Sequence, residues 1–344
     1  MLNGQLYGTK NCLIGKGARL RDSVQCYLYK AGENILQLNE QAERKVLIKA
    51  PLVNAATVIS DLVLQPLIKK DSIQRIAFAV MNKQGSSRTF TIPVNLNGQP
   101  FYTAKLTLEP GEKKVMSCQV NAKTIGWQQV NIFAVSGRFK VYRDPQESLL
   151  MSLEGTKDLS GFGNNARIIG GNNLQDRGVH PFLSGPDSYM EIPNAPSLDE
   201  MGTTLTMMAW IYPTEQVPGL VDVFSKGDTH VLQIVDGEML SFFAGGWGRG
   251  DITVPLPEHW LNHWHHIAGV CDKQGLKIYI DGVLKGETKL DEPVNLFVGN
   301  KWTIGRNEEF PGTRIFKGYI QQPKIFSDPI EITSCKCIGE VPVL

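Results

Sequence analysis

The fold of this chain is decided near its C-terminal end, by the stretch Leu276-Lys-Ile-Tyr-Ile-Asp-Gly282. Apolar residues alternate there with Lys277 and Tyr279, the period-two pattern of a strand whose two faces have different surroundings. Asp281-Gly282 follows at once, and such a pair supplies the positive φ angles of a tight hairpin turn. The stretch therefore predicts a strand that ends in a β-hairpin.

The same pattern recurs along most of the chain. Alternating runs occur at 75–81, 89–94, 130–135 and 205–211. Turn signals separate them at Asn97-Gly98, Glu109-Pro-Gly-Glu112, Ser136-Gly137 and Asp236-Gly237. Many short strands joined by tight turns indicate an all-β sandwich or barrel. A single short helical turn is expected at 196–201, where Ser197 is placed to cap with Glu200.

Composition narrows the class of protein. The chain has 344 residues, of which 42% are hydrophobic and 20% charged, enough for two globular domains. The formal net charge is +1, so no long-range field attracts nucleic acid or anionic lipid, and neither is an expected partner. The longest apolar runs are strand-sized, which argues against membrane insertion.

Six cysteines are scattered along the chain, at positions 12, 26, 118, 271, 335 and 337. They are too few for the disulfide framework of a small secreted domain. Cys335-Lys-Cys337 lacks the two-residue spacing of a zinc knuckle. Reduced thiols, several of them buried, are therefore expected, with structural disulfides as the alternative.

A domain boundary is predicted at Tyr142-Arg-Asp-Pro-Gln-Glu-Ser148, where a polar stretch with proline interrupts the alternation. The predicted organisation is an N-terminal segment, 1–44, a first β-sandwich, 45–143, a second, 149–328, and a C-terminal tail, 329–344. In the N-terminal segment, glycines interrupt the apolar pattern. It forms either the first strands of its own domain, with a pair near Val24–Tyr29 and Asn34–Leu38, or an arm that docks on a neighbouring subunit.

The second half resembles the laminin-G-like jelly rolls of concanavalin A type in six segments that stand in the family's order. The segments are Asp158-Leu-Ser-Gly-Phe-Gly-Asn-Asn-Ala166, Tyr189-Met-Glu-Ile-Pro193, Leu205-Thr-Met-Met-Ala-Trp-Ile-Tyr-Pro213, Trp264-His-His-Ile-Ala-Gly-Val270, Leu276–Gly282 and Gly318-Tyr-Ile-Gln-Gln-Pro-Lys-Ile-Phe326. The resemblance implies a two-sheet sandwich used for binding and display. In the third segment Leu205, Met207, Ala209 and Ile211 then share the inward face, with Trp210 on the other.

The first half is similar to immunoglobulin-like adhesion modules. The similarity rests on 77–94 followed by Leu106-Thr-Leu-Glu-Pro-Gly-Glu112. It implies an immunoglobulin-like sandwich that serves as a spacer or docking module and carries no chemistry.

The jelly-roll resemblance also implies a calcium site. Asp158 would supply the carboxylate, with carbonyl oxygens from the turn between Gly161 and Asn164. Gln321 stands where the family usually has an acidic residue, and an amide brings no charge, so the resemblance implies a weakened or absent site. Alternatively, Asp158 is a turn residue that accepts hydrogen bonds from its own backbone.

The best candidate for ligand binding is the loop Gly245-Gly-Trp-Gly-Arg-Gly-Asp251. Aromatic faces stack on sugar rings, and arginine or aspartate bonds hydroxyls, so Trp247, Arg249 and Asp251 are predicted to bind a glycan. Trp302 and Arg306 are second candidates. The alternative is a mobile loop whose tryptophan covers the edge of the core.

The chain carries no recognisable catalytic motif. His259, His263, His265 and His266 are candidate zinc ligands, but His265 and His266 would face opposite sides of a strand. One of these two is therefore expected to pack or bond within the sandwich. Glu308 and Glu309 are adjacent too, unlike the paired carboxylates of glycosidases, which face the same way. There is no G-x-S-x-G elbow, H-E-x-x-H motif or phosphate loop. The sequence predicts a protein that is not an enzyme.

Two functions remain after these exclusions, with a glycoside hydrolase a distant third. The first is a structural subunit of a bacteriophage virion (decoration, collar, baseplate or fibre) that displays a glycan- or protein-binding jelly roll and assembles with itself or with other subunits. The start of the sequence favours this function, because it lacks the basic stretch and apolar core of a signal peptide. The second is a secreted, periplasmic or cell-surface carbohydrate-binding protein whose signal has been removed.

Overall fold

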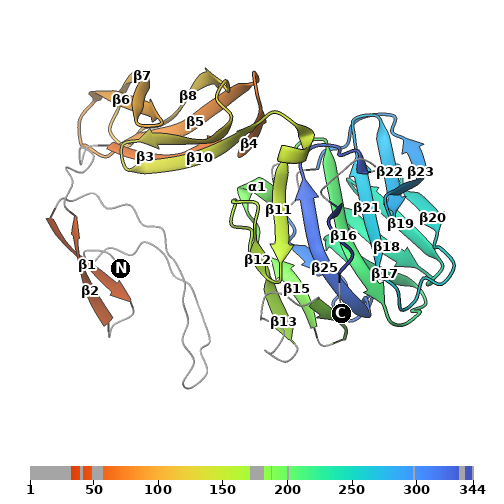
Figure 1. Cartoon of the computed structure of the whole chain (residues 1–344). Coiled ribbons are helices and arrows are strands. Elements are labelled where there is room, and N and C mark those ends of the chain that lie inside the picture. The colour runs from red at the N-terminus through yellow and green to blue at the C-terminus, as the bar shows by residue number, and fades with distance from the viewer. Residues whose placement is uncertain are drawn as a thin grey trace. The chain divides into compact units, whose positions relative to one another are not determined.

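The computed structural model of the protein describes residues 32–38, 42–48, 57–170, 182–186, 188–199, 201–296, 299–332 and 338–342. The chain divides into two compact units, Met1–Leu64 with Asp71–Lys140, and Gln65–Lys70 with Val141–Leu344. Within the described ranges the regular elements are strands, apart from the helix α1 (Pro196–Asp199) and one 3-10 turn (Pro145–Glu147) (Figure 1). The prediction of an all-β protein is confirmed.

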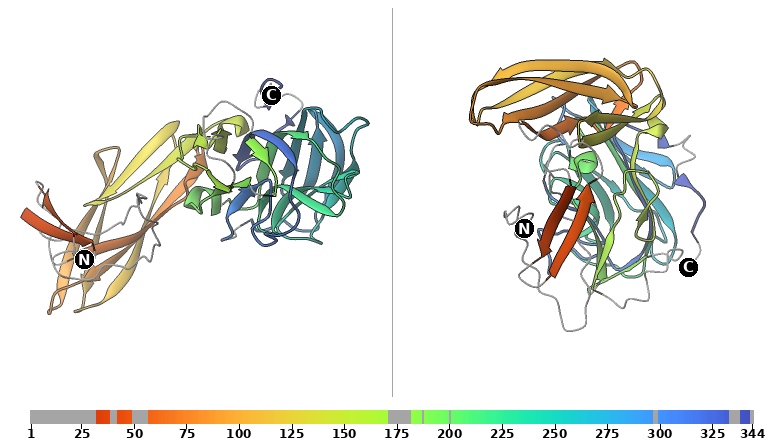
Figure 2. Two further views of the ribbon diagram at one scale, coloured as in Figure 1. Left: turned by 90° about the horizontal axis from the view of Figure 1, so that it is seen from below. Right: turned by 90° about the vertical axis from the view of Figure 1, so that its left-hand side faces the viewer.

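The first unit is a sandwich of short antiparallel strands (Figures 1 and 2). One sheet has the order β3-β5-β8, and the other the order β10-β9-β6-β7. The strands are β3 (Thr57–Leu64), β5 (Ile73–Asn82), β6 (Arg88–Leu96), β7 (Gln99–Leu108), β8 (Lys113–Asn121), β9 (Gly126–Ile132) and β10 (Val135–Tyr142). The short strand β4 (Leu67–Lys69) lies in the stretch Gln65–Lys70, which is assigned to the second unit. Placing β3, β5 and β8 on one sheet and β6, β9 and β10 on the other gives an immunoglobulin-like arrangement, in which β7 extends the second sheet beside β6.

Alternation along the strands creates the core of this unit. On β5, Ile76, Phe78 and Val80 are fully buried, because they share the face that points at the other sheet. Asn97 (φ 51°) and Gly98 (φ 78°) form the turn between β6 and β7, as their sequence predicts.

The turn predicted at Ser136-Gly137 is wrong. Both residues lie inside β10, and the chain turns instead at Phe133, whose φ is 52°. A Cβ at Gly137 would lie 2.7 Å from Leu64 Cδ1 and 2.9 Å from Leu62 Cδ2. This glycine therefore serves the close approach of side chains from β3 and not a change of chain direction.

Two further strands precede the first sandwich. β1 (Gly32–Leu38) pairs with β2 (Ala42–Ile48) in antiparallel register. Asn34–Leu38 is thus a strand as predicted, but its partner is β2; Val24–Tyr29, the partner proposed from sequence, lies outside the described residues. The predicted boundary at residue 44 would cut β2.

The second unit is a two-sheet jelly roll. One sheet has the order β12-β11-β25-β16-β21-β22-β23, with β14 also paired to β25; the other has the order β13-β15-β24-β17-β18-β19-β20. The first sheet contains β11 (Leu149–Glu154), β12 (Lys157–Asp158), β14 (Phe182–Ser184), β16 (Leu205–Pro213), β21 (His265–Cys271), β22 (Gly275–Ile280), β23 (Val283–Lys289) and β25 (Gly318–Phe326). The second contains β13 (Arg167–Gly170), β15 (Ser188–Ile192), β17 (Leu220–Lys226), β18 (His230–Val235), β19 (Met239–Ala244), β20 (Ile252–Pro255) and β24 (Trp302–Ile304).

The main core lies between these sheets. On β16, Leu205, Met207, Ala209 and Ile211 point into it, as predicted. Ile267 of β21 also belongs to this core. Asp281 (φ 52°) and Gly282 (φ 77°) form the turn that joins β22 to β23, so the stretch that decides the fold does end in a hairpin.

Part of the outer face of the first sheet is covered by the C-terminal strap, which we define as residues 328–332 and 338–342. Ile330 and Ile332 pack on Met208 and Val270, all at most 3% exposed. The indole N–H of Trp210 donates to the Ile338 carbonyl oxygen at 2.8 Å. The segment predicted as a tail therefore contributes a second layer of apolar packing.

The short helix forms where the sequence predicts it but begins differently. The backbone N–H groups of Leu198 and Asp199 donate to the Ala195 carbonyl oxygen. Ser197 lies inside the helix and its hydroxyl bonds Asn164, so it is not the cap that its spacing from Glu200 suggests.

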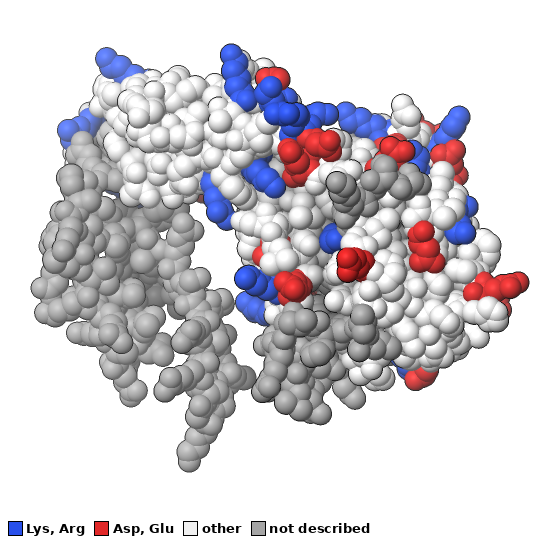
Figure 3. Space-filling model, in the orientation of Figure 1, with Lys and Arg blue, Asp and Glu red and all other residues white. Residues whose placement is uncertain are grey.

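The surface and the thiols agree with the composition. Acidic and basic side chains are interspersed on the visible face of the second unit (Figure 3). Cys118 and Cys271 are buried free thiols, and burial raises the pKa of Cys271 to about 12; the other four cysteines lie outside the described residues. No helix in the described part of the chain is long and apolar enough to span a bilayer.

Candidate ligand-binding site

The loop Gly245–Asp251, between β19 and β20, is held open by glycines. Gly245, Gly246, Gly248 and Gly250 have φ angles of 86°, 107°, 81° and 110°, a region that side-chain-bearing residues avoid. The backbone N–H of Gly248 donates to Asp251 Oδ1 at 2.7 Å. Asp251 therefore closes the loop, and one of its oxygens is committed to the backbone.

Trp247 is presented to solvent at the tip of this loop. Its side chain is 61% exposed, the largest exposure among the described tryptophans. Its ring meets Phe243 edge to face, with centroids 5.3 Å apart. Such a contact orients the indole and leaves much of its surface free. Arg249 is exposed two residues on.

The second pair of predicted binding residues lies elsewhere. Trp302 is 1% exposed in the core, with its ring centroid 5.2 Å from that of Phe224, so it has no surface on which a ligand could stack. The guanidinium of Arg306 lies 4.6 Å above the Tyr189 ring and donates to the Pro186 carbonyl oxygen.

The structure thus brings Trp247, Arg249 and Asp251 together and separates them from Arg306. Tyr189, beneath Arg306, is on β15, four strand spacings from β19 and about 19 Å away. The tryptophan loop is the single cluster of predicted binding residues that the fold preserves.

The predicted calcium ligands are engaged with one another. Asp158 Oδ1 accepts the backbone N–H groups of Ser152 (3.0 Å) and Ser160 (2.9 Å). Oδ2 accepts the Ser160 hydroxyl (2.7 Å) and the Asn164 backbone N–H (2.8 Å). Two donors already point at each oxygen, so a cation would have to displace protein hydrogen bonds.

The remaining calcium candidates fit no better. The side-chain amide of Asn164 donates to the Leu150 carbonyl oxygen and accepts a hydrogen bond from the Ser197 hydroxyl. Gln321 lies on β25, two strands and about 10 Å from Asp158 on β12, whereas calcium ligands lie about 2.3–2.6 Å from the ion. Gly161 (φ 89°) shapes the turn. The geometry corresponds to the turn role of Asp158, and calcium binding stays an untested prediction.

Two of the four candidate histidines, His265 and His266, are part of the sandwich, whereas His259 and His263 are exposed. His265 stacks on Trp260 with centroids 4.3 Å apart, and its Nδ1 lies 2.8 Å from Asp281 Oδ2. His266 faces the other way, against Trp210. Burial lowers the pKa of His266 to about 4, so it is neutral at pH 7. The part of the chain that the structure describes contains no cluster of three His, Cys, Asp or Glu side chains able to hold a metal.

Glu308 and Glu309 accept hydrogen bonds from backbone N–H groups. Glu308 Oε1 accepts the Lys301 N–H at 2.7 Å, and Glu309 Oε2 accepts the Asp228 N–H at 3.1 Å. Glu309 Oε1 also accepts the Asn300 side-chain amide, so both carboxylates brace residues 300–301 and neither is placed as an acid or a nucleophile.

Sequence reasoning missed a buried polar cluster around Asp222. This residue is fully buried on β17, and burial raises its pKa to about 6. Asn307 donates to its Oδ2 at 2.8 Å, and Arg314 Nη1 lies 3.7 Å away. The one signal in the sequence was an acidic residue inside an apolar run, Leu220-Val-Asp-Val-Phe224. The cluster fastens the 305–316 segment to β17.

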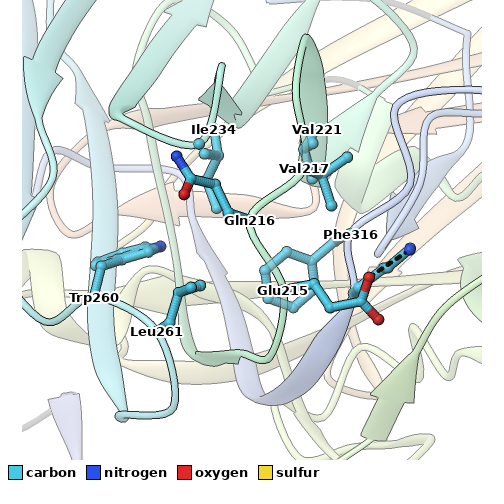
Figure 4. A pocket seen from close by; sticks show the side chains of 10 residues that line it. Glu215, Gln216, Val217, Val221, Ile234, Trp260, Leu261 and Phe316 are labelled. Atoms are coloured by element: carbon cyan, nitrogen blue, oxygen red, sulfur yellow. Dashed lines mark hydrogen bonds and ion pairs between the residues drawn. The ribbon is translucent and has the colours of Figure 1, made fainter.

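An enclosed cavity beside the core is too small for a ligand. Trp260, Leu261, Val221, Ile234 and Phe316 line it (Figure 4). Its volume is about 10 Å³, close to that of one water molecule.

Comparison with known proteins supports the fold. Residues 183–332 match the family model of the concanavalin A-like lectin/glucanases superfamily, of laminin-G type. The second unit is therefore a concanavalin A-like jelly roll, and the predicted resemblance is confirmed. No curated protein matched the chain.

Solved structures that are similar to the chain include a toxin binding domain and one domain of an arabinanase. The binding domain of botulinum neurotoxin DC, in complex with rat synaptotagmin II, is 18% identical, with a TM-score of 0.42 over 55% of this chain and 51% of that chain. Domain 4 of AbnA, a GH43 extracellular arabinanase from Geobacillus stearothermophilus, in complex with arabinotriose, is 17% identical, with a TM-score of 0.39 over 54% of this chain and 97% of that chain. The chain thus spans about half of the toxin domain and nearly all of the arabinanase domain.

Proposed function

We propose that this chain is a non-catalytic recognition protein whose jelly roll binds a glycan through Trp247. The observation that carries the proposal is the exposed indole, 61% accessible and braced by Phe243, on a loop closed by Asp251. A braced ring loses little conformational freedom on binding, so the stacking energy is not spent on ordering the loop. Arg249, exposed beside it, supplies donors for sugar hydroxyls.

The test is binding of purified protein to a glycan array, followed by titration of the strongest binder. Trp247→Ala should weaken binding at least tenfold, since a stacked aromatic ring supplies about 1.5 kcal/mol or more. Trp127→Ala is the matched control, because Trp127 is also exposed (37%) but lies in the first unit beneath Arg138. Binding by Trp247→Ala equal to that of the unaltered protein would refute this site.

We propose further that the protein has no hydrolytic activity. Glu308 and Glu309 are committed to backbone N–H groups, and Asp251 to its own loop. Reproducible release of reducing sugar by the purified protein, lost on Glu308→Gln or Asp251→Asn, would contradict this.

The setting that we propose is a bacteriophage virion, in which the first unit acts as spacer or docking module and copies of the chain associate with one another or with other subunits. The buried free thiols of Cys118 and Cys271 suit a protein assembled in a reducing compartment. The alternative setting is a secreted, periplasmic or cell-surface carbohydrate-binding protein. Mass spectrometry of purified particles from a producing culture separates them, because the chain should copurify with particles in the first case alone.

A further inference from the structure

Three aromatic side chains and one leucine form a row, which we call the aromatic row, across the outer face of the first sheet of the jelly roll: Leu183, Tyr319, Tyr212 and Trp264. Leu183 of β14 pairs with Tyr319 of β25, which in turn pairs with Tyr212 of β16. Trp264 directly precedes β21, the other neighbour of β16. Their chain neighbours Ile320 and Ile211 point into the core, so Tyr319 and Tyr212 point away from it.

The rings of the row contact one another and remain partly exposed. Tyr212 meets Trp264 with centroids 5.6 Å apart, and Tyr319 with centroids 6.0 Å apart, both edge to face. Leu183 is 38% exposed. Such a row combines apolar faces with polar tips, the chemistry that suits sugar rings bearing hydroxyls.

A hollow of about 360 Å³ adjoins the row at Leu183. Its lining also includes Pro186, Ser188, Thr214, Glu215 and Lys317. The volume falls in the range of small-molecule sites, about 300–1,000 Å³. The lining is richer in hydroxyls and charges than a pocket for an apolar ligand, so it favours a ligand that both donates and accepts hydrogen bonds.

Ser188 places an unsatisfied hydroxyl in the lining of the hollow. The residue is 7% exposed, and its Oγ has no hydrogen-bond partner in the described part of the chain. A buried hydroxyl without a partner is unfavourable unless a ligand or water meets it. At the rim, Lys317 Nζ lies 2.6 Å from Glu215 Oε2, an ion pair that offers both a donor and an acceptor (dashed line in Figure 4).

We propose that the hollow and the aromatic row form a second saccharide subsite, separate from the Trp247 loop. One sugar unit occupies the hollow, with hydroxyls on Ser188, Glu215 and Lys317, and the chain continues over the rings. The proposal rests on glycan recognition as the function. It makes each jelly roll bivalent, so that two weak contacts to one polysaccharide reinforce each other.

The experiment is calorimetric titration of the full chain with defined hexasaccharides: cellohexaose, maltohexaose and chitohexaose. Two molecules of the best binder should bind per chain. Ser188→Ala and Lys317→Met should each weaken one of the two sites about fivefold to tenfold, as expected for the loss of one hydrogen bond. Trp264→Ala should weaken the same site by a similar factor.

Control variants separate binding from folding. Ser188→Ala should melt at the temperature of the unaltered protein, because it removes a buried group that has no partner. Lys113→Met is matched to Lys317→Met, since Lys113 also forms an exposed 2.6 Å ion pair, with Asp61 of the first unit. It should leave both affinities unchanged.

The outcomes distinguish the two proposals. If Trp247→Ala abolishes all binding and the hollow variants have no effect, the second subsite is refuted and the proposed function stands. If the hollow variants weaken binding and Trp247→Ala does not, the second subsite stands and the loop site is refuted. If no hexasaccharide binds, both are refuted, and capture of a protein by the row would be the remaining explanation for its exposed rings.

Discussion

At the scale of single residues, Asp158 shows how a resemblance can point to the right residue for a different role. Each oxygen of the carboxylate already accepts two hydrogen bonds, and the four donors come from Ser152, Ser160 and Asn164. It ties the turn after β12 to β11. The residue is 8% exposed, so these bonds are made in a largely dry environment, where losing them leaves donors unsatisfied.

We therefore expect Asp158→Ala to lower the free energy of unfolding by about 2–4 kcal/mol, measured by urea denaturation. Asp144→Ala is the control: Asp144 caps an exposed 3-10 turn, and its loss should cost about 1 kcal/mol. Millimolar calcium should leave the melting temperature of the unaltered protein unchanged. A rise with calcium that Asp158→Ala abolishes would restore the metal prediction.

The pH dependence of stability is also set by single residues. Burial lowers the pKa values of His230 and His266 to about 4, so the unfolded chain takes up their protons first and stability is lost as pH falls from 6.5 towards 4. Asp222 acts in the opposite direction, because burial raises its pKa to about 6 and stability is gained as pH falls from 6 towards 3.8. Each of these groups changes the free energy of unfolding by about 3 kcal/mol. The loss of stability from the two imidazoles therefore exceeds the gain from the one carboxyl.

The melting temperature should accordingly fall between pH 7 and pH 4.5. His266→Gln removes one of the two buried imidazoles, so its profile should be shallower. His263→Gln, at an exposed position, should follow the unaltered protein. A melting temperature that does not fall over this range would show that the buried imidazoles do not control acid stability.

At the scale of elements, β16 is buried on both faces along most of its length, up to Ile211. Met207 and Ile211 face the jelly-roll core, while Met208 and Trp210 lie under the C-terminal strap. Strands buried on both faces read as nearly continuous apolar runs, and Leu205–Pro213 does so except at Thr206, whose hydroxyl donates to the Asp328 carbonyl oxygen. The strap is thus part of the packing of the domain.

Removing residues 329–344 should destabilise the second unit by about 3 kcal/mol or more, from the lost burial of Ile330 and Ile332. The exposed patch should bind the dye ANS. Trp210→Phe, which keeps an aromatic side chain but removes the indole N–H that bonds Ile338, should cost about 1 kcal/mol or more. Unchanged thermal melting of the truncated protein would contradict this assignment of the strap.

At the scale of the whole molecule, the two units should behave as separately folding bodies. We expect limited proteolysis to cut near residues 143–149, at the polar joint, and to leave two resistant fragments. Mass spectrometry of the fragments locates the cut. Protection of the joint until the whole chain is degraded in one step would contradict two independent units.

Assembly is the other prediction at this scale. If the N-terminal segment is a docking arm, deletion of residues 1–40 leaves a folded protein that no longer associates, because an arm contributes strands to a neighbour and not to its own core. Light scattering measures the association and circular dichroism the fold. Loss of the fold, or unchanged association, would rule out the arm. This deletion also removes β1. A second variant that lacks Gly32–Leu38 alone therefore tests whether this strand is needed for association.

Local sequence determined much of this protein. Period-two alternation determined that the fold is all-β. Asn97-Gly98 and Asp281-Gly282 determined two hairpins, because the positive φ angles of such turns depend on the turn residues themselves. Six segments in order determined the jelly roll. Tertiary structure decided what local pattern could not: Gly137 serves a close approach in place of a turn, Trp302 is buried while Trp247 is exposed, and the oxygens of Asp158 are already occupied. Each of these depends on which distant segment lies alongside, and burial and hydrogen-bond partners are properties of that contact, not of the residue type.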